Sequence, residues 1–279
     1  MNIGADTDIQ KFLTDYANEK KTLQGIPKFL WLWEDYLNTD RIEFIDRADF
    51  PIEKKIKIIK GLDIKNKLFG TYNKIFRYLE PLIEEVNRNE KRTFKILELA
   101  GGLGDLSIGL YEVANKKKKE FDILITGSDI IPNYVDISND QVAAKNMEIE
   151  FKVIDAMSLS EVEGEKFDIV ISLHSLHHFS PFEISKLIQN AKKVSNYGLF
   201  AVDGKRNFLN LVFMIMTALI PSVLSMNFMF LHDAIISGRK MYRSSFLLRL
   251  GLASSPDSIV ESGEFSLGLE YLKVTPQEN

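Results

Sequence analysis

The chain of 279 residues contains no cysteine. Disulfide bonds, thiolate nucleophiles and cysteine-ligated metal sites are therefore excluded. A secretory signal peptide is lacking as well, because residues 1–20 are polar and charged rather than apolar. We therefore expect a cytoplasmic protein.

The chain also lacks a strong excess of charge of one sign. Its net charge is −4 and its pI is about 5.7, whereas a nucleic-acid-binding protein normally presents a basic face. A basic run at residues 116–119 follows the end of a predicted helix, where cations are favourable. We expect no nucleic-acid partner, and a folded soluble protein with one large domain or two smaller ones.

Charge is absent altogether from Phe208–Leu231. By length this run could span a bilayer. It is interrupted by polar residues and by Pro221, and it lies between a predicted core strand and the last strands of the chain. We predict two short helices that break near Pro221 and form an apolar lid, since methionine and phenylalanine suit an adaptable pocket. Peripheral membrane contact stays open as an alternative.

The stretch Lys95-Ile-Leu-Glu-Leu-Ala-Gly-Gly-Leu-Gly-Asp-Leu-Ser107 predicts a buried strand, a tight glycine turn and the start of a helix. Glycine lets the backbone approach a ligand, and free N–H groups at a helix start favour an anionic group. Dinucleotides and S-adenosylmethionine both bind at such a turn. The dinucleotide pattern G-x-G-x-x-G would need a glycine at Ser107 and fits poorly. A turn that only joins a strand to a helix is the remaining alternative.

Two further predicted strands end in an acidic residue, Asp129 or Asp155. Asp129, with Ile130 beside it, follows Gly104 by 25 residues, which leaves room for one helix and one strand. In a βαβ unit this carboxylate lies at the carboxyl end of the neighbouring strand, where it can accept both ribose hydroxyls of a nucleoside. The alternative for Asp155 is capping of the helix predicted near Ser158.

The alternation of strands and helices over residues 94–206 predicts a parallel sheet with crossover helices. After it, Ser258–Phe265 and Leu267–Val274 predict an antiparallel hairpin. We expect an α/β fold, Rossmann-like and doubly wound, with a mostly parallel seven-stranded sheet. A helical N-terminal cap at residues 1–92 precedes a domain at 93–279, which carries an apolar helical insertion at 207–250.

The glycine stretch resembles motif I of class I S-adenosylmethionine-dependent methyltransferases, usually Asp-Val-Gly-x-Gly-x-Gly. Glu98 matches the acid, Gly102 and Gly104 match the last two glycines, and Ala100 replaces the first. The extra methyl group of the alanine could tighten the turn. The resemblance implies that these residues and Gly101 bind S-adenosylmethionine.

The same resemblance implies roles for residues further along the chain. Asp155 would receive the adenine amino group, the N–H of Ala156 would face the adenine ring, and His174 would meet the methionine part of the cofactor. Leu176-His-His-Phe179 resembles the segment after the fourth strand in small-molecule methyltransferases, including those of quinone biosynthesis. The Asn/Asp-Pro-Pro-Tyr motif of enzymes that methylate nucleic-acid bases or glutamine side chains is lacking.

Residues 7–92 predict helices without a strand, among them 29–37, 51–60 and 63–86. Pro81 is expected to kink or restart the last of these. This part of the chain suits a cap over the substrate, a homodimer contact or plain scaffold, and these alternatives stay open.

Two short elements resemble a group of bacterial methyltransferases that accompanies polyketide-type biosynthesis. Glu43-Phe-Ile-Asp46 followed by Asn66–Gly70 resembles the region before motif I in that group. His232-Asp-Ala-Ile-Ile-Ser-Gly-Arg-Lys-Met-Tyr242 resembles the element after its lid. The resemblance implies that Asn66 and Tyr72 lie near the pocket.

Histidine can take a phenolic proton at neutral pH, since its unperturbed pKa is about 6.5. We predict His232, beside Asp233, and His177 as candidates for a general base, with packing, capping or no base at all as alternatives. Three histidines in residues 174–178 could bind a metal, but no carboxylate spacing supports a site. We expect none.

These observations predict an S-adenosylmethionine-dependent methyltransferase that acts on a small or medium hydrophobic acceptor. O-methylation of a phenol- or quinone-like compound is the first expectation and C-methylation the second. One alternative is a regulatory or structural protein that binds the cofactor without turnover, and another is a nicotinamide oxidoreductase.

Overall fold

The computed structural model describes the chain except residues 1–2, 26–35, 37, 118–120, 225–227 and 278–279. Most of the helix predicted at 29–37 lies outside the described residues. The chain divides into two compact units. Unit 1 contains residues 1–55, 174–189 and 201–279, and unit 2 contains residues 56–173 and 190–200. The predicted domain boundary at residue 92 stays a prediction.

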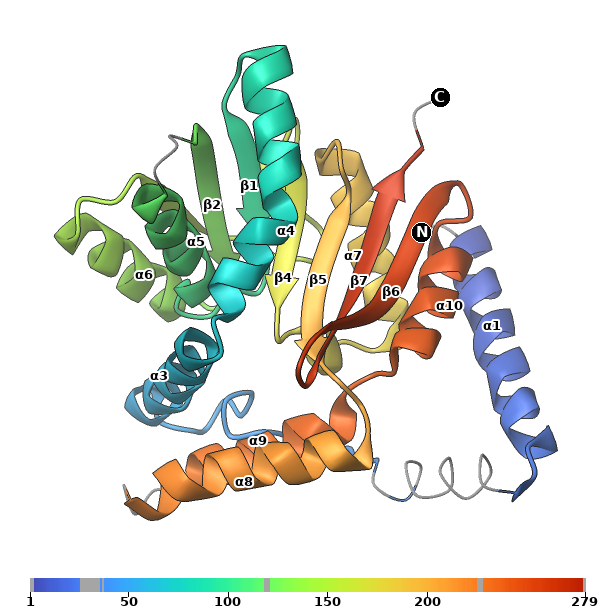
Figure 1. Cartoon of the computed structure of the whole chain (residues 1–279). Helices are drawn as coiled ribbons and strands as arrows, with labels where there is room; N and C mark the ends of the chain where they lie inside the picture. The colour runs from blue at the N-terminus through green and yellow to red at the C-terminus, as the bar shows by residue number, and fades with distance from the viewer. Residues whose placement is uncertain (1–2, 26–35, 37, 118–120, 225–227, 278–279) are drawn as a thin grey trace. The chain divides into compact units, whose positions relative to one another are not determined.

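The described elements follow the predicted alternation (Figure 1). The helices are α1 (Ile3–Thr22), α3 (Ile52–Leu68), α4 (Thr71–Glu85), α5 (Asp105–Lys116), α6 (Pro132–Ala144), α7 (Pro181–Val194), α8 (Phe208–Leu224), α9 (Met229–Lys240) and α10 (Ser244–Ser254). The strands are β1 (Phe94–Glu98), β2 (Ile123–Asp129), β3 (Ile149–Val153), β4 (Ile169–Leu173), β5 (Leu199–Gly204), β6 (Ser258–Ser266) and β7 (Leu269–Pro276). Short helical turns are η1 (Val86–Glu90), η2 (Ser160–Val162) and η3 (Leu176–His178).

The strands form one seven-stranded sheet in the order β3-β2-β1-β4-β5-β7-β6. β1 pairs in parallel with β2 and with β4, and β2 pairs in parallel with β3. β6 and β7 form the antiparallel hairpin. The prediction of a mostly parallel, Rossmann-like sheet is confirmed. In unit 2 the carboxyl ends of β1, β2, β3 and β4 consequently share one edge.

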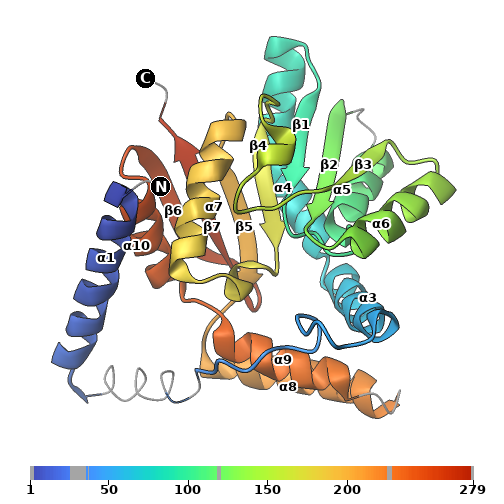
Figure 2. The ribbon, with the colours of Figure 1, turned by 180° about the vertical axis from the view of Figure 1, so that it is seen from behind.

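The core of unit 2 is built on the central strands. Three of the five residues of β1 (Phe94, Ile96 and Leu97) are apolar and buried, as expected for a strand covered on both faces. Helices α5 and α6 lie beside β2 in both views (Figures 1 and 2). α4 packs closely on α5. The ring of Tyr72 in α4 lies so near Gly109 in α5 that a Cβ at Gly109 would be 2.4 Å from it. The absence of a side chain at this glycine therefore allows the aromatic contact.

A buried carboxylate joins the amino ends of two central strands of unit 2. Asp168, only 1% exposed, accepts two hydrogen bonds of 2.7 Å from the Arg92 guanidinium. It also accepts the backbone N–H of Lys95 at 2.8 Å and the side-chain amide of Asn196 at 3.1 Å. Burial alone would raise the pKa of this carboxyl, but the hydrogen bonds from Arg92, Lys95 and Asn196 together outweigh burial and lower it. The starts of β1 and β4 and the turn before β5 are therefore joined through one side chain.

Unit 1 contains α1, α8, α9 and α10, most of α7 and the hairpin. α8 and α9 lie side by side, and α1 lies beside α10 (Figures 1 and 2). Phe246 of α10 contacts Phe12 and Tyr16 of α1, with ring centroids 5.4 and 5.0 Å apart. Among the described residues no helix is long and apolar enough to cross a membrane.

Three predicted helix boundaries are wrong. No break occurs near Asp63: α3 continues to Leu68, and the chain turns at Gly70, whose φ of 64° suits glycine. α4 does not restart at Pro81 but continues through it, because its buried face, which includes Phe76 and Ile83, extends on both sides of the proline; the kink predicted there stays a prediction. α8 likewise continues through Pro221 to Leu224. In α4, tertiary packing offsets the cost of a proline in a helix interior, about 3 kcal/mol.

Replacement of the buried carboxylate should destabilise the fold. We expect Asp168→Ala to lower the free energy of unfolding by about 3–5 kcal/mol, because it leaves Arg92 and a backbone N–H without their acceptor. Urea denaturation measures the change. Glu264→Ala, which removes an exposed ion pair with Lys205, is the control and should change stability by less than about 1 kcal/mol. Equal effects of the two substitutions would contradict the role given to Asp168.

Candidate functional site

The turn after β1 requires left-handed backbone at three residues of unit 2. Ala100, Gly102 and Gly104 have φ values of 53°, 58° and 72°. The N–H of Gly104 donates to the carbonyl oxygen of Gly101 at 2.9 Å. A Cβ at Gly104 would lie 2.2 Å from the ring of Phe151, so only glycine fits there. Ala100 holds a conformation that is unfavourable for a residue with a Cβ.

Glu98 lies beneath this turn and is 1% exposed. One carboxylate oxygen, Oε2, accepts the hydroxyl and the backbone N–H of Ser107 in the first turn of α5. A Cβ at Gly101 would lie 2.7 Å from the Glu98 carboxyl carbon, so the turn rests directly on this side chain. Burial raises the pKa of Glu98 to about 8, although the Ser107 hydrogen bonds oppose the shift.

Asp129 holds the same turn from the end of β2. Its Oδ2 accepts the N–H of Gly102 at 2.8 Å, and its Oδ1 accepts the N–H of Ile131 at 2.9 Å. Both bonds fix the carboxylate at the carboxyl edge of the sheet. Ile130, beside it, is 61% exposed. A fixed acid next to an exposed apolar side chain is suited to a ribose and the base it carries.

The loop after β3 is held by a residue that sequence reasoning missed. Asp155 Oδ1 accepts the N–H of Met157 at 2.8 Å, an interaction within the loop. Asn190 of α7 donates to the carbonyl oxygens of Ala156 and Met157 at 3.4 and 3.0 Å. Asn190 lies in a plain helical pattern and carries no sequence signal for this contact.

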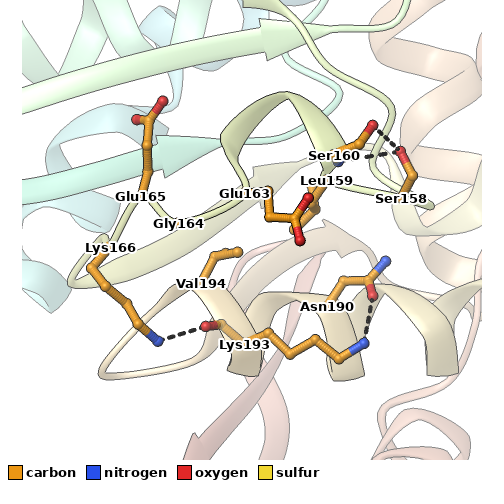
Figure 3. Close-up of a pocket in the computed structure, with 10 residues that line it drawn as sticks. All are labelled: Ser158, Leu159, Ser160, Glu163, Gly164, Glu165, Lys166, Asn190, Lys193 and Val194. Carbon is orange, nitrogen blue, oxygen red and sulfur yellow. Dashed lines mark hydrogen bonds between the residues drawn. The ribbon is translucent and has the colours of Figure 1, made fainter.

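Asn190 also lines a pocket of about 420 Å³ in unit 2 (Figure 3). Its other walls come from residues 158–166 and from the last turns of α7. The Lys166 ammonium donates to the carbonyl oxygen of Lys193, and the Lys193 ammonium lies 3.5 Å from the side-chain oxygen of Asn190. None of the predicted site residues lines this pocket. The pocket is therefore separate from the candidate site.

Unit 1 brings together four sequence elements that lie far apart in the chain. His177 Nδ1 lies 2.9 Å from both carboxylate oxygens of Asp203, at the end of β5. His178 Nδ1 lies 3.0 Å from Oδ2 of Asp46. Glu43, from the same E-x-x-D element as Asp46, accepts the hydroxyl of Ser237 of α9 at 2.6 Å. Each carboxylate therefore has a partner from another segment.

These contacts shift the pKa values of the group. Burial alone would raise the pKa of Asp203, but the charge and hydrogen bond of His177 outweigh it and lower the pKa to about 2. Burial alone would lower the pKa of His178, but its hydrogen bond to Asp46 and the charge of Glu43 raise it. His174, with a φ of 56°, has its Nδ1 3.9 Å from Asp203 Oδ1. The predicted methionine contact of His174 stays a prediction.

His232 faces its chain neighbour. Its Nδ1 lies 2.8 Å from Asp233 Oδ1, although neighbouring side chains on a helix rarely meet. Asp233 also accepts the N–H of Phe44 at 2.9 Å and that of Ile45 at 3.1 Å. The ring of His232 lies 4.2 Å from the ring of Phe44, which stacks on Phe50 at 4.7 Å.

Two further residues expected near the pocket are buried in unit 2. Tyr72 donates its hydroxyl to Asp63 at 2.8 Å, and Asn66 is buried in α3. Burial raises the pKa of the Tyr72 hydroxyl well above its usual value. Their proximity to a substrate stays a prediction.

Known proteins resemble this chain in part of its sequence and in its fold. The family described as "Methyltransferase domain" matches residues 96–198. Residues 96–198 are therefore a methyltransferase domain. No curated protein sequence matches the chain.

Solved structures share the fold of this methyltransferase domain. The plantazolicin methyltransferase BpumL in complex with SAH has a TM-score of 0.58 at 13% identity, over 90% of this chain and 98% of that chain. The plantazolicin methyltransferase BamL, in complex with a triazolic desmethylPZN analog and SAH, has a TM-score of 0.57 at 12% identity, over 80% and 91%. At such identities the likeness concerns the fold.

The residues of the methyltransferase domain fit the cofactor. A Cβ at Gly102 would meet only Ile59, at 3.9 Å, so the backbone is open to a ligand there. Asp129 and Asp155 stand after neighbouring parallel strands, and each carboxylate oxygen that accepts one N–H can accept a second hydrogen bond. These residues would hold the ribose and the adenine of S-adenosylmethionine.

Loss of the acid after β2 should weaken cofactor binding. We expect Asp129→Ala to reduce the affinity for SAH by about 1–3 kcal/mol, because a charged hydrogen-bond acceptor is lost. Isothermal titration calorimetry measures the affinity. Asp122→Ala, at the other end of β2, is the matched control and should bind as the parent does. An unchanged affinity in Asp129→Ala would contradict the assignment.

The raised pKa of Glu98 predicts a pH-dependent stability. Between pH 4.5 and about 8 the Glu98 carboxyl keeps its proton in the folded protein, whereas in the unfolded chain it has lost it. The free energy of unfolding should therefore fall as pH rises through this range. Glu98→Gln should remove this slope and be the more stable form near pH 8, by a few kcal/mol at most, at about 1.4 kcal/mol per pKa unit. Chemical denaturation across this range measures both proteins. Parallel pH profiles would contradict the prediction.

Proposed function

We propose that this protein methylates an oxygen of a small or medium hydrophobic acceptor, of phenol or quinone type. The observation that carries the proposal is the contact between His232, Asp233 and Phe44 in unit 1. It combines a candidate proton acceptor with partly exposed aromatic rings, and aromatic rings favour stacking with an aromatic acceptor.

The reaction sets few chemical demands on the protein. S-adenosylmethionine, when bound, supplies a methyl group on a sulfonium, which is already a good electrophile. The protein then has to align the acceptor oxygen with that methyl group and exclude competing orientations. A phenol must also lose its proton, and a positioned base accelerates that step by about 10²–10⁴-fold.

His232 is suited to accept the proton. Asp233 is held by two backbone N–H groups, and its carboxylate faces Nδ1 of the histidine. This contact favours the tautomer that donates from Nδ1, in which Nε2 keeps its lone pair. Asp233 therefore acts as a positioning residue, and His232 as the candidate catalytic residue.

Helix α8 supports an apolar acceptor. It carries no charged side chain, and it packs on α9 through Leu211 and Met214, which approach Gly238. Its exposed residues are apolar: Phe208, Leu209, Val212, Met216, Leu219 and Val223. The plantazolicin methyltransferases BpumL and BamL, which share the fold, were crystallised in complex with azolic desmethylPZN analogs and SAH. A cover for a hydrophobic molecule is the simplest use of α8, and peripheral membrane contact is its alternative.

The acceptor class is tested with labelled cofactor. Incubation of the purified protein with methyl-labelled S-adenosylmethionine and separate phenol, quinone and lipid pools should label the phenol or quinone pool. Label on a carbon atom would replace O-methylation by C-methylation. Binding of the cofactor without transfer to any pool would favour a regulatory protein instead.

The base assignment predicts a slow His232→Ala variant. With the acceptor found above, we expect single-turnover transfer to slow by about 10²–10⁴-fold while SAH affinity stays at the parental value. The loss should shrink for acceptors of lower pKa, since they arrive already ionised. Ile235→Ala, on the same helix, is the control for packing. Near-parental rates of His232→Ala from pH 6 to 9 would show that positioning alone suffices.

A further inference from the structure

We infer that Glu43, His177 and His178 form a binding site for a divalent transition-metal ion of the zinc or iron(II) type. One ligand atom of each residue lies within 4.8 Å of the others. Two imidazoles and one carboxylate are a ligand set typical of such ions, whereas magnesium and calcium prefer oxygen ligands. The site lies entirely within unit 1, and metal binding can be measured without methyl transfer.

Both histidines are oriented as metal-bound histidines usually are. Nδ1 of His177 lies against Asp203 and Nδ1 of His178 against Asp46, at 2.9 and 3.0 Å. Metal-ligating histidines commonly donate the second ring N–H to a carboxylate, which fixes the tautomer and leaves the other nitrogen for the metal. Nε2 of His177 lies 3.9 Å from Oε1 of Glu43.

Glu43 supplies the independent observation. The residue is 2% exposed, and its Oε2 accepts the Ser237 hydroxyl. Its other oxygen, Oε1, is fully buried and has no hydrogen-bond partner in the described part of the chain. The Lys240 ammonium, 3.4 Å away, is its charged neighbour, but a buried carboxylate oxygen that accepts no hydrogen bond is costly, and nearly all such atoms accept one in folded proteins. A metal ion between Oε1 and the two imidazoles would satisfy it.

The charges in the group also favour a divalent cation. Glu43, Asp46 and Asp203 are three carboxylates, and Lys240 places one ammonium 3.4 Å from Glu43 Oε1 and 3.8 Å from Asp46 Oδ2. With neutral imidazoles, two negative charges remain. Metal binding would displace the lysine from Oε1, and a 2+ ion would then restore the balance.

The geometry requires a modest closure. Ligand atoms around a tetrahedral zinc ion, at 2.0–2.1 Å from the metal, are about 3.4 Å apart. The three side chains would therefore move together by roughly 1 Å. Three protein ligands leave at least one coordination position for water or for an oxygen of a bound molecule. A metal on Nε2 of His177 occupies the lone pair that a general base needs, so the base role falls to His232.

The experiment titrates Zn²⁺ and Co²⁺ into untagged, chelator-treated protein. We expect one ion per chain, Co²⁺ absorption bands in the visible range, and no competition by Mg²⁺. His178→Ala and Glu43→Gln should each weaken Zn²⁺ binding by more than about 100-fold. Asp46→Asn, which alters only the partner of a ligand, should weaken it by about 10–100-fold. His232→Ala is the matched control from the same unit and should bind as the parent does.

Three results would overturn the site: no stoichiometric Zn²⁺ in the parent, parental affinity in His178→Ala, or an equal loss in His232→Ala. Circular dichroism melts identify variants that fail to fold. If Glu43→Gln does not fold, the comparison of His178→Ala with Asp46→Asn decides. A parent that binds no metal but transfers methyl groups would refute the site and leave the proposed function intact.

Discussion

The left-handed turn after β1 depends on two carboxyl side chains, and the candidate cofactor site of unit 2 depends on that turn. Glu98 lies beneath the turn and binds the start of α5 through Ser107. Asp129 accepts a backbone N–H of the turn and so joins the ends of β1 and β2. Because the backbone has positive φ at Ala100, small deviations would cost energy, and these hydrogen bonds offset that cost. The residues that shape the cofactor site are thus also the ones that hold it in place.

Unit 1 is organised by a different principle, the pairing of carboxylates with histidines. Asp203 and Asp46 each engage one of two adjacent imidazoles, and Asp233 engages a third. Similar pairs can serve different ends. Beside His177 and His178 the buried Oε1 of Glu43 suits a cation, whereas His232 lies against the ring of Phe44. The surroundings, rather than the residue type, distinguish a proton acceptor from a metal ligand.

The helices show where packing outweighs local preference. Pro81 lies within α4, and its neighbours on the buried face continue in register on both sides. Gly70, in contrast, starts α4 with a backbone conformation that favours glycine. Proline is unfavourable inside a helix but is tolerated there when burial is extensive. Glycine permits a left-handed backbone and is used where the chain must turn.

The sequence by itself determined the sheet, its flanking helices and the acids at the strand ends. Hydrophobic periodicity and glycine spacing are local signals, and in a parallel sheet the carboxyl ends of neighbouring strands meet. Only the tertiary structure decided that Glu43 meets His177, that Asn190 supports the loop after Asp155, and that α4 passes through Pro81. A metal site was not expected from spacing because its candidate carboxylate lies far away in the chain. Contacts between distant segments depend on how whole elements pack, and no local pattern encodes them.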